Sequence, residues 1–163
     1  MIKMVEIVPA RECDVEAVKN ITYTDVKEVY PKYYPAGAVQ MFLDYHDTPY
    51  ILKDIEAGCV YLLKVDGIGV GTVTIKENEV ARLYLLPEYQ HKGYGRMLFE
   101  FAESLVFTNY TFVRVDSSLP AKEIYVERGY REIEYHAMDS GHGDYLCYDV
   151  MIKVRSNEPK RTN

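Results

Sequence analysis

The residues best suited to chemistry lie in one turn, Gln90-His91-Lys92-Gly93-Tyr94-Gly95. The turn follows a short apolar segment, Ala81–Leu86, with the alternation expected of a strand. From Met97 onward, apolar residues recur at helical spacing. The first N–H groups of a helix have no partner within it, and the helix dipole together with Lys92 and Arg96 adds positive charge there. The sequence therefore predicts that a phosphate or diphosphate binds where this helix begins.

The same turn resembles a family signature. It fits the (Gln/Arg)-x-x-Gly-x-(Gly/Ala) pattern of the GNAT superfamily of acyl-CoA-dependent N-acetyltransferases, and Leu83–Pro87 resembles the strand that leads into that pattern. A second segment, Ser118–Tyr130, resembles the family's Asn-x-x-Ala-x-x-(apolar)-Tyr-x-x-x-Gly-(Phe/Tyr) motif, with Ser118 in place of the asparagine. The resemblance covers residues 60 to 130 and implies the GNAT fold, with acetyl-CoA as the co-substrate and no metal.

The resemblance also implies roles for individual residues. Tyr125 would donate a proton to the departing thiolate, a general acid step that typically accelerates a reaction about 10²–10⁴-fold. The main-chain N–H near Leu85 would stabilise the oxyanion. The alternative for Tyr125 is a packing role, since it is one of 16 tyrosines. The full set expected to bind the cofactor is Leu83, Tyr84, Leu85, Gln90, His91, Lys92, Gly93, Tyr94, Gly95, Arg96, Ser118 and Tyr125.

A general base is harder to assign, because an amine protonated at neutral pH must lose a proton before it attacks. Glu79, at the start of the central strand, is the candidate, and Asp116 is the alternative. For either residue, a solvated carboxylate in a turn is the competing interpretation. The histidines and the three dispersed cysteines form no pattern that indicates a metal site or a catalytic triad.

The acceptor site is expected in the first helices and the final hairpin, where aromatic residues gather. Aromatic walls could hold an amine by cation–π contact, could close the core, or could form a homodimer contact. The aromatic residues concerned are Tyr30, Tyr33, Tyr34, Tyr45, Tyr135, His136, Tyr145 and Tyr148.

The elements that must position these residues follow an α/β order. A first helix is expected after Asp14, up to the break that begins at Val29. Further helices are expected over residues 38–44 and 48–57, the last with Thr48 as N-cap, and a strand meander over residues 60–86 follows them. A helix, a strand at 111–115, a short helix at 121–128 and a hairpin at 130–154 complete the pattern. The first strand is expected over Lys3–Val8, with Pro9 just beyond its end. The prediction is a mixed sheet of about six or seven strands with flanking helices, in one domain spanning residues 1–154 with a flexible tail at 155–163.

Composition limits the remaining function classes. The formal net charge of −6 disfavours a nucleic-acid partner, and no apolar run approaches the roughly 20 residues of a membrane span. The absence of a leader pattern and the unpaired cysteines suggest a cytoplasmic protein. We therefore expect an acetyltransferase acting on a small-molecule or peptide amine. The alternatives are a catalytically silent acyl-CoA-binding module and a nucleotide- or phosphate-binding domain.

Overall fold

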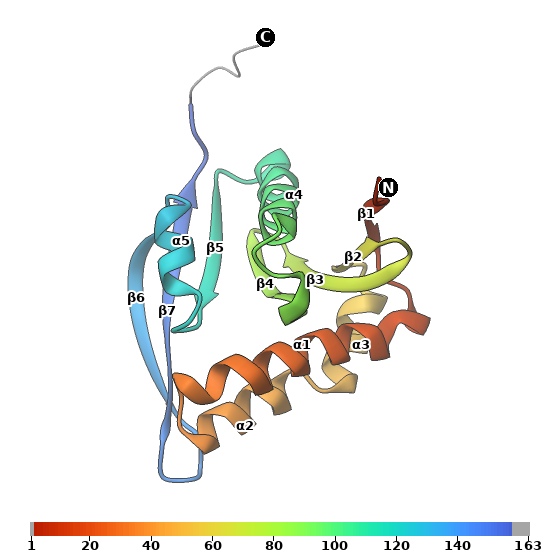
Figure 1. Cartoon of the computed structure of the whole chain (residues 1–163). Coiled ribbons are helices and arrows are strands. Elements are labelled where there is room, and N and C mark those ends of the chain that lie inside the picture. Colours follow the sequence, from red (N-terminus) through yellow and green to blue (C-terminus); the bar gives the residue numbers. More distant parts are fainter. Residues whose placement is uncertain (1, 158–163) are drawn as a thin grey trace.

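The chain folds around one mixed sheet of seven strands in the order β1-β2-β3-β4-β5-β7-β6 (Figure 1). The computed structural model describes residues 2–157. The strands are β1 (Val5–Pro9), β2 (Val60–Val65), β3 (Ile68–Lys76), β4 (Glu79–Leu85), β5 (Phe112–Ser117), β6 (Arg131–Asp139) and β7 (Tyr145–Val154). The helices are α1 (Val15–Val29), α2 (Ala36–Tyr45), α3 (Thr48–Glu56), α4 (Tyr94–Asn109) and α5 (Lys122–Glu127). Short 3₁₀ turns, η1 (Glu12–Asp14), η2 (Tyr30–Lys32) and η3 (Pro87–Tyr89), connect some of them.

The sheet consists of two antiparallel halves that meet at one parallel junction. Strands β1 to β4 form a meander, and β5, β7 and β6 form the second half. Between β4 and β5 the backbone ladder contains a single pair, Glu79 with Arg114. Glu79 begins β4, so the carboxyl ends of the two strands diverge beyond this pair, and both leave main-chain groups free for another partner.

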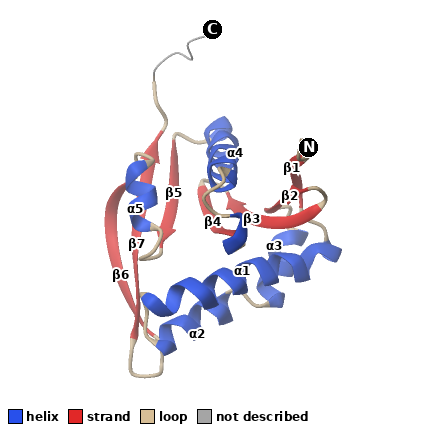
Figure 2. Ribbon diagram, in the orientation of Figure 1, coloured by secondary structure: helices blue, strands red, loops and turns tan. Residues whose placement is uncertain are grey.

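Helices cover both faces of the sheet, and each face has its own apolar core (Figure 2). Successive residues of β2 point to opposite faces, so Leu62 packs with helices α1 to α3 and Leu63 packs with α4. Helix α4 supplies Leu98, Ala102 and Val106 to its core. These two cores fix α1 and α4 on either side of the junction between β4 and β5.

Several boundaries differ from the sequence expectation for local reasons. Pro9 is the last residue of β1 and pairs with Tyr61, because an edge strand tolerates a residue without an N–H. Asp47, rather than Thr48, caps α3, and its carboxylate accepts the N–H of Thr48 at 2.7 Å. Helix α4 begins at Tyr94, so Gly95 lies in its first turn.

The ends of the chain add two findings. Arg155 is held beside β5, since its N–H donates to the carbonyl of Thr111 at 2.8 Å. The rest of the expected tail from residue 158 lies outside the described residues. No helix within residues 2–157 is long and apolar enough to cross a membrane.

Candidate active site

The predicted anion-binding turn leads into α4 through two residues with left-handed backbone. Gly93 is the N-cap, with φ of +89°, and His91 has φ of +59°. The Gly93 conformation suits glycine far better than other residues. The N–H groups of Tyr94, Gly95 and Arg96 belong to the first helical turn, and the first intrahelical bond runs from the Met97 N–H to the Gly93 carbonyl. The geometry can therefore present several donors to an anion.

The charged side chains of this turn lie at the surface. Arg96 donates to Glu100 at 3.1 Å, and both side chains are exposed. The ammonium of Lys92 lies 5.6 Å from the ring centre of Tyr89. Both cations remain within reach of solvent, where they can attract an anion without being buried.

Gln90 connects this turn to two other elements. Its Nε2 donates to the carboxylate of Asp25 on α1 at 2.9 Å and to the carbonyl of Leu85 at 3.1 Å. Burial raises the pKa of Asp25 to about 6, opposed by the Gln90 hydrogen bond and reinforced by Glu28. Both donors of the Gln90 amide are thus used to fix the end of β4 against α1. No sequence pattern indicated Asp25, which is 65 residues from Gln90.

Two cavities with a shared boundary lie beside β4 and the end of β5. The larger cavity, about 570 Å³, extends from that gap to the turn before α4 and includes Asp25, Leu85, Gln90, His91, Gly95 and Arg96 in its lining. The smaller cavity, about 310 Å³, includes Phe42, His46, Glu79, Arg82, Asp116 and Tyr148. Six residues line both cavities, namely Tyr30, Leu83, Tyr84, Ser118, Ala121 and Tyr125.

Tyr125 lies at this shared boundary, on α5. Its side chain is only 7% exposed and packs edge-on against Phe99 and Tyr130 at 5.3 and 5.2 Å between ring centres. Within residues 2–157 its hydroxyl has no hydrogen-bond partner. Every fully buried side-chain oxygen or nitrogen in that range does have one, so the Tyr125 hydroxyl is not fully buried. The hydroxyl therefore opens into the cavities. Burial raises the pKa of Tyr125 far above its usual value, which keeps the phenol protonated and able to donate.

The loop carrying Ser118 is positioned by tyrosines from the first half of the chain. Tyr34 donates to the carbonyl of Cys147 and accepts the N–H of Leu119, both at 2.8 Å. The hydroxyls of Tyr30 and Tyr84 lie 3.3 Å apart at the boundary of the two cavities. Ser118 is buried beside them, where the family motif has asparagine.

Glu79 lines the smaller cavity at the start of β4. Burial raises its pKa, and the nearby Asp116 carboxylate raises it further, while Arg114 opposes the shift. A carboxylate with a raised pKa is a better proton acceptor near neutral pH. The two residues named as alternatives for the general base thus lie in the same cavity.

The aromatic residues expected at the acceptor site divide into three groups. Tyr30, Tyr45 and Tyr148 line the smaller cavity, and His136 stacks on Tyr148 with 5.1 Å between ring centres. Tyr34 is buried by its loop contacts. Tyr33, Tyr135 and Tyr145 are exposed by more than half of their side-chain surface. Part of the set therefore forms a wall of the cavity.

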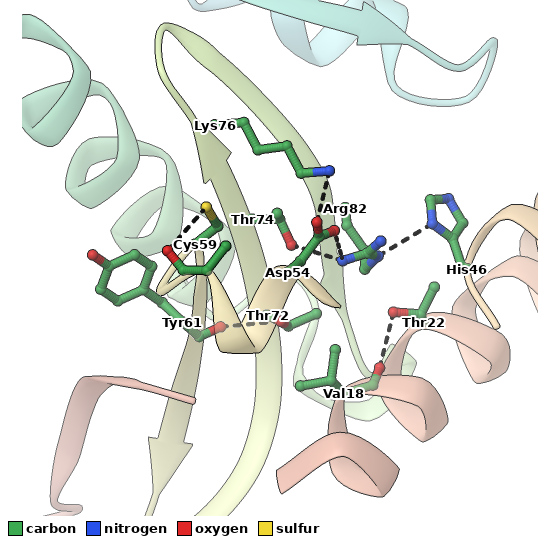
Figure 3. Close-up of polar contacts among 11 residues, drawn as sticks. Val18, Thr22, His46, Asp54, Cys59, Tyr61, Thr72, Thr74, Lys76 and Arg82 are labelled. Atoms are coloured by element: carbon green, nitrogen blue, oxygen red, sulfur yellow. Dashed lines mark hydrogen bonds and ion pairs between the residues drawn. The ribbon is translucent and has the colours of Figure 1, made fainter. Parts of the chain in front are cut away.

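Two polar residues of the smaller cavity were not predicted, His46 and Arg82. Arg82 interrupts β4 with φ of +46°, next to a break in the register between β3 and β4. Its side chain is buried among groups from α2, α3 and β3 (Figure 3). An arginine inside an apolar strand was the available indication, but its partners are distant in sequence.

Comparison with known proteins assigns the family. Residues 22–142, most of the chain, match the model of the acetyltransferase (GNAT) domain. The chain therefore belongs to the GNAT acetyltransferase family, and its seven-stranded mixed sheet is the fold of that family. No curated protein matches the sequence.

Solved structures support the same fold at low sequence identity. A GCN5-related N-acetyltransferase from Rhodopseudomonas palustris has a TM-score of 0.85 and 19% identity, with 95% of this chain and 99% of that chain covered. The PaiA N-acetyltransferase of Thermoplasma acidophilum, in complex with coenzyme A, has a TM-score of 0.74 and 20% identity, covering 93% and 99%. YncA of Salmonella typhimurium, a putative acetyltransferase solved with acetyl-CoA, has a TM-score of 0.69 and 16% identity, covering 98% and 99%.

Proposed function

We propose that the protein transfers an acetyl group from acetyl-CoA to a primary amine, by direct attack within a ternary complex. The coenzyme would occupy the larger cavity, with its diphosphate on the N–H groups at the start of α4. Its pantetheine arm would lie along the free edge of β4 at Leu83–Leu85, as another strand would. The coenzyme A and acetyl-CoA bound to two structural relatives support this assignment.

The acceptor amine would reach the thioester from the smaller cavity. Its nitrogen attacks the thioester carbon, a carbon–nitrogen bond forms, and the carbon–sulfur bond breaks. Before the attack, Glu79 would take a proton from the acceptor ammonium, directly or through water, because only the neutral amine has a lone pair. The Tyr125 hydroxyl would give its proton to the departing sulfur, and the phenolate would be reprotonated by the second proton that the nitrogen loses as the amide forms, directly or through water.

One observation supports this proposal above the others: the unpartnered Tyr125 hydroxyl opens where the two cavities share a wall. A phenol held only by packing would not need to face both cavities. Its raised pKa keeps the proton on the phenol until a thiolate develops beside it.

The experiment has two parts. Isothermal titration with coenzyme A, acetyl-CoA and ATP separates an acyl-CoA protein from a nucleotide-binding domain. Thiol release over a panel of amines, polyamines, aminoglycosides and peptide N-termini then separates an enzyme from a silent binder. Tight coenzyme binding without release for any amine would establish the silent module and refute the enzyme.

Two further assignments belong to this proposal. The free thiols Cys13, Cys59 and Cys147 support a reducing compartment, which for this chain would be the cytoplasm. The exposed Tyr135 and Tyr145 of the final hairpin would supply the contact of a homodimer, which sedimentation can test. Residues 1–154 would act as a single domain.

A further inference from the structure

The smaller cavity contains a fixed pair of hydrogen-bond donors, His46 and Arg82. The Arg82 guanidinium donates from Nε to Nδ1 of His46 at 3.2 Å. From Nη1 it donates to Asp54 at 3.0 Å and to Thr74 at 3.1 Å. Lys76 binds the second oxygen of Asp54 at 2.8 Å, so both cations share one buried carboxylate (Figure 3). These contacts hold Arg82 in one orientation.

That arrangement fixes the tautomer of His46. A guanidinium has only donors, so Nδ1 of His46 must accept with its lone pair, and the ring proton must reside on Nε2. Burial lowers the pKa of His46 to about 3, as does the Arg82 charge; Lys76 acts in the same direction and Asp54 opposes it. His46 is therefore neutral at physiological pH, and it has no free lone pair with which to act as a base.

The remaining donors of the pair are unsatisfied. Within the part of the chain that the structure describes, Nε2 of His46 and Nη2 of Arg82 have no hydrogen-bond partner. In that part of the chain, every fully buried side-chain nitrogen has a hydrogen-bond partner, so these two nitrogens are accessible to solvent. Both residues line the smaller cavity. The ring of His46 is held edge-on to Tyr84, 5.9 Å between ring centres.

The same cavity contains carboxylates as well. Glu79 and Asp116 line it, and the Glu79 carboxyl is near the Asp116 charge. The cavity thus offers acceptors for an ammonium and separate donors for an oxygen. Donors left unpaired in a pocket discriminate strongly against ligands that cannot use them.

We infer that His46 Nε2–H and Arg82 Nη2 bind a carbonyl or carboxylate oxygen of the acceptor, so the substrates are amines that carry such an oxygen, rather than plain alkylamines or polyamines. This inference rests on the proposed function, since it names the substrate class of that reaction. His46 is a specificity-determining residue in this arrangement, and the attacking amine is directed toward Glu79 and Tyr125.

The kinetic test uses matched probes. The assay measures thiol release from acetyl-CoA. The oxygen-bearing probes are the ω-amino acids from glycine to 6-aminohexanoate and their amides, and they are compared with n-alkylamines of equal length and with spermidine. We expect kcat/KM for the best oxygen-bearing probe to exceed that of its alkylamine at least tenfold. His46→Phe keeps a ring against Tyr84 and removes the donor, and should reduce this ratio about tenfold, mainly through KM. His46→Gln, which can donate and accept, should restore part of it.

Equal activity with alkylamines, or a ratio unchanged in His46→Phe, would overturn the inference while leaving the proposed function intact. If no probe reacts, the proposed function fails, and NMR decides the inference separately. Long-range ¹H–¹⁵N spectra of the wild-type protein should show His46 neutral, protonated at Nε2, and unprotonated at Nδ1 from pH 5 to 8. The chemical shift of His46 Nε2 should change when the amino acid probes are added and not when the alkylamines are added. A titration of His46 near the ordinary histidine pKa, the opposite tautomer, or an Nε2 shift that no probe changes would refute the inference.

Discussion

Replacing Gly95 by valine should separate coenzyme binding from folding. Gly95 lines the larger cavity in the first turn of α4, and a Cβ built there meets no protein atom within 4 Å. Its φ lies outside the left-handed region, so a side chain causes no backbone strain there, in contrast to Gly93. The new side chain would fill only space that the diphosphate is proposed to occupy.

Gly95→Val should affect the stability of the fold and the binding of coenzyme A in opposite directions. Glycine is about 0.5–1 kcal/mol less favourable than alanine inside a helix, and valine recovers part of that difference, so Gly95→Val should leave the unfolding free energy unchanged or raise it by up to about 0.5 kcal/mol. Displacing the diphosphate removes at least two N–H bonds to a charged group, each about 1.5–3 kcal/mol. The sum, about 3–6 kcal/mol, corresponds to a Kd about 10²–10⁴-fold weaker.

The assays are isothermal titration with coenzyme A and urea unfolding of the same preparations. Ser104→Val serves as the control, because Ser104 is an exposed residue of α4 outside both cavities and also gains a β-branched side chain. The control should bind coenzyme A as the wild type does. Undiminished affinity in a folded Gly95→Val protein would refute the proposed diphosphate site.

Three further predictions concern the residues around the cavities. Tyr125→Phe should lower kcat about 10²–10⁴-fold while the Kd for coenzyme A stays within about threefold; an unchanged kcat with chemistry rate-limiting would exclude the general acid role. The pKa of Asp25 is raised in the folded state to about 6 from 3.8, so its ionisation destabilises the fold increasingly as pH rises from 3.8 to 6. Asp25→Asn should therefore raise the unfolding free energy at pH 7 by up to about 3 kcal/mol and have little effect below pH 4. Urea unfolding at the two pH values measures this, and a stability gain found only at low pH would contradict the expected direction. Asp54→Asn should destabilise the protein by about 3–5 kcal/mol, because Arg82 would remain buried without its anion, and a loss below about 1 kcal/mol in urea unfolding would show that other groups neutralise it.

Local patterns predicted the fold well where the physical cause was itself local. The meander, the long helix after the glycine turn and the mixed sheet follow from periodicity and turn residues. The short helix expected at 121–128 is α5, and Gly129, with φ of +93°, follows its C-cap residue Arg128. The two family motifs implied the GNAT fold, and the family match and the seven-stranded mixed sheet confirm it.

The features that sequence could not predict depend on residues far apart in the chain. The hydrogen bond from Gln90 to Asp25 and that from Arg82 to His46 join residues separated by 65 and 36 positions. The first depends on the packing of α1 against β4, and the second on the place of His46 directly after α2; no local pattern specifies either. The prediction of the α3 N-cap was wrong for a smaller reason: adjacent Asp47 and Thr48 are both good caps, and Lys19 binds the side chains of both, at 2.8 and 3.3 Å.

The single backbone pair between β4 and β5 has a thermodynamic consequence for the protein at work. A pantetheine arm bound along β4 would complete hydrogen bonding that the polypeptide leaves unfinished, and so couple the two half-sheets. Ligand binding to the folded state alone stabilises it by about 2.7 kcal/mol when the ligand is a hundredfold above its Kd. The heat tolerance of the protein in the cell would then follow the supply of its coenzyme.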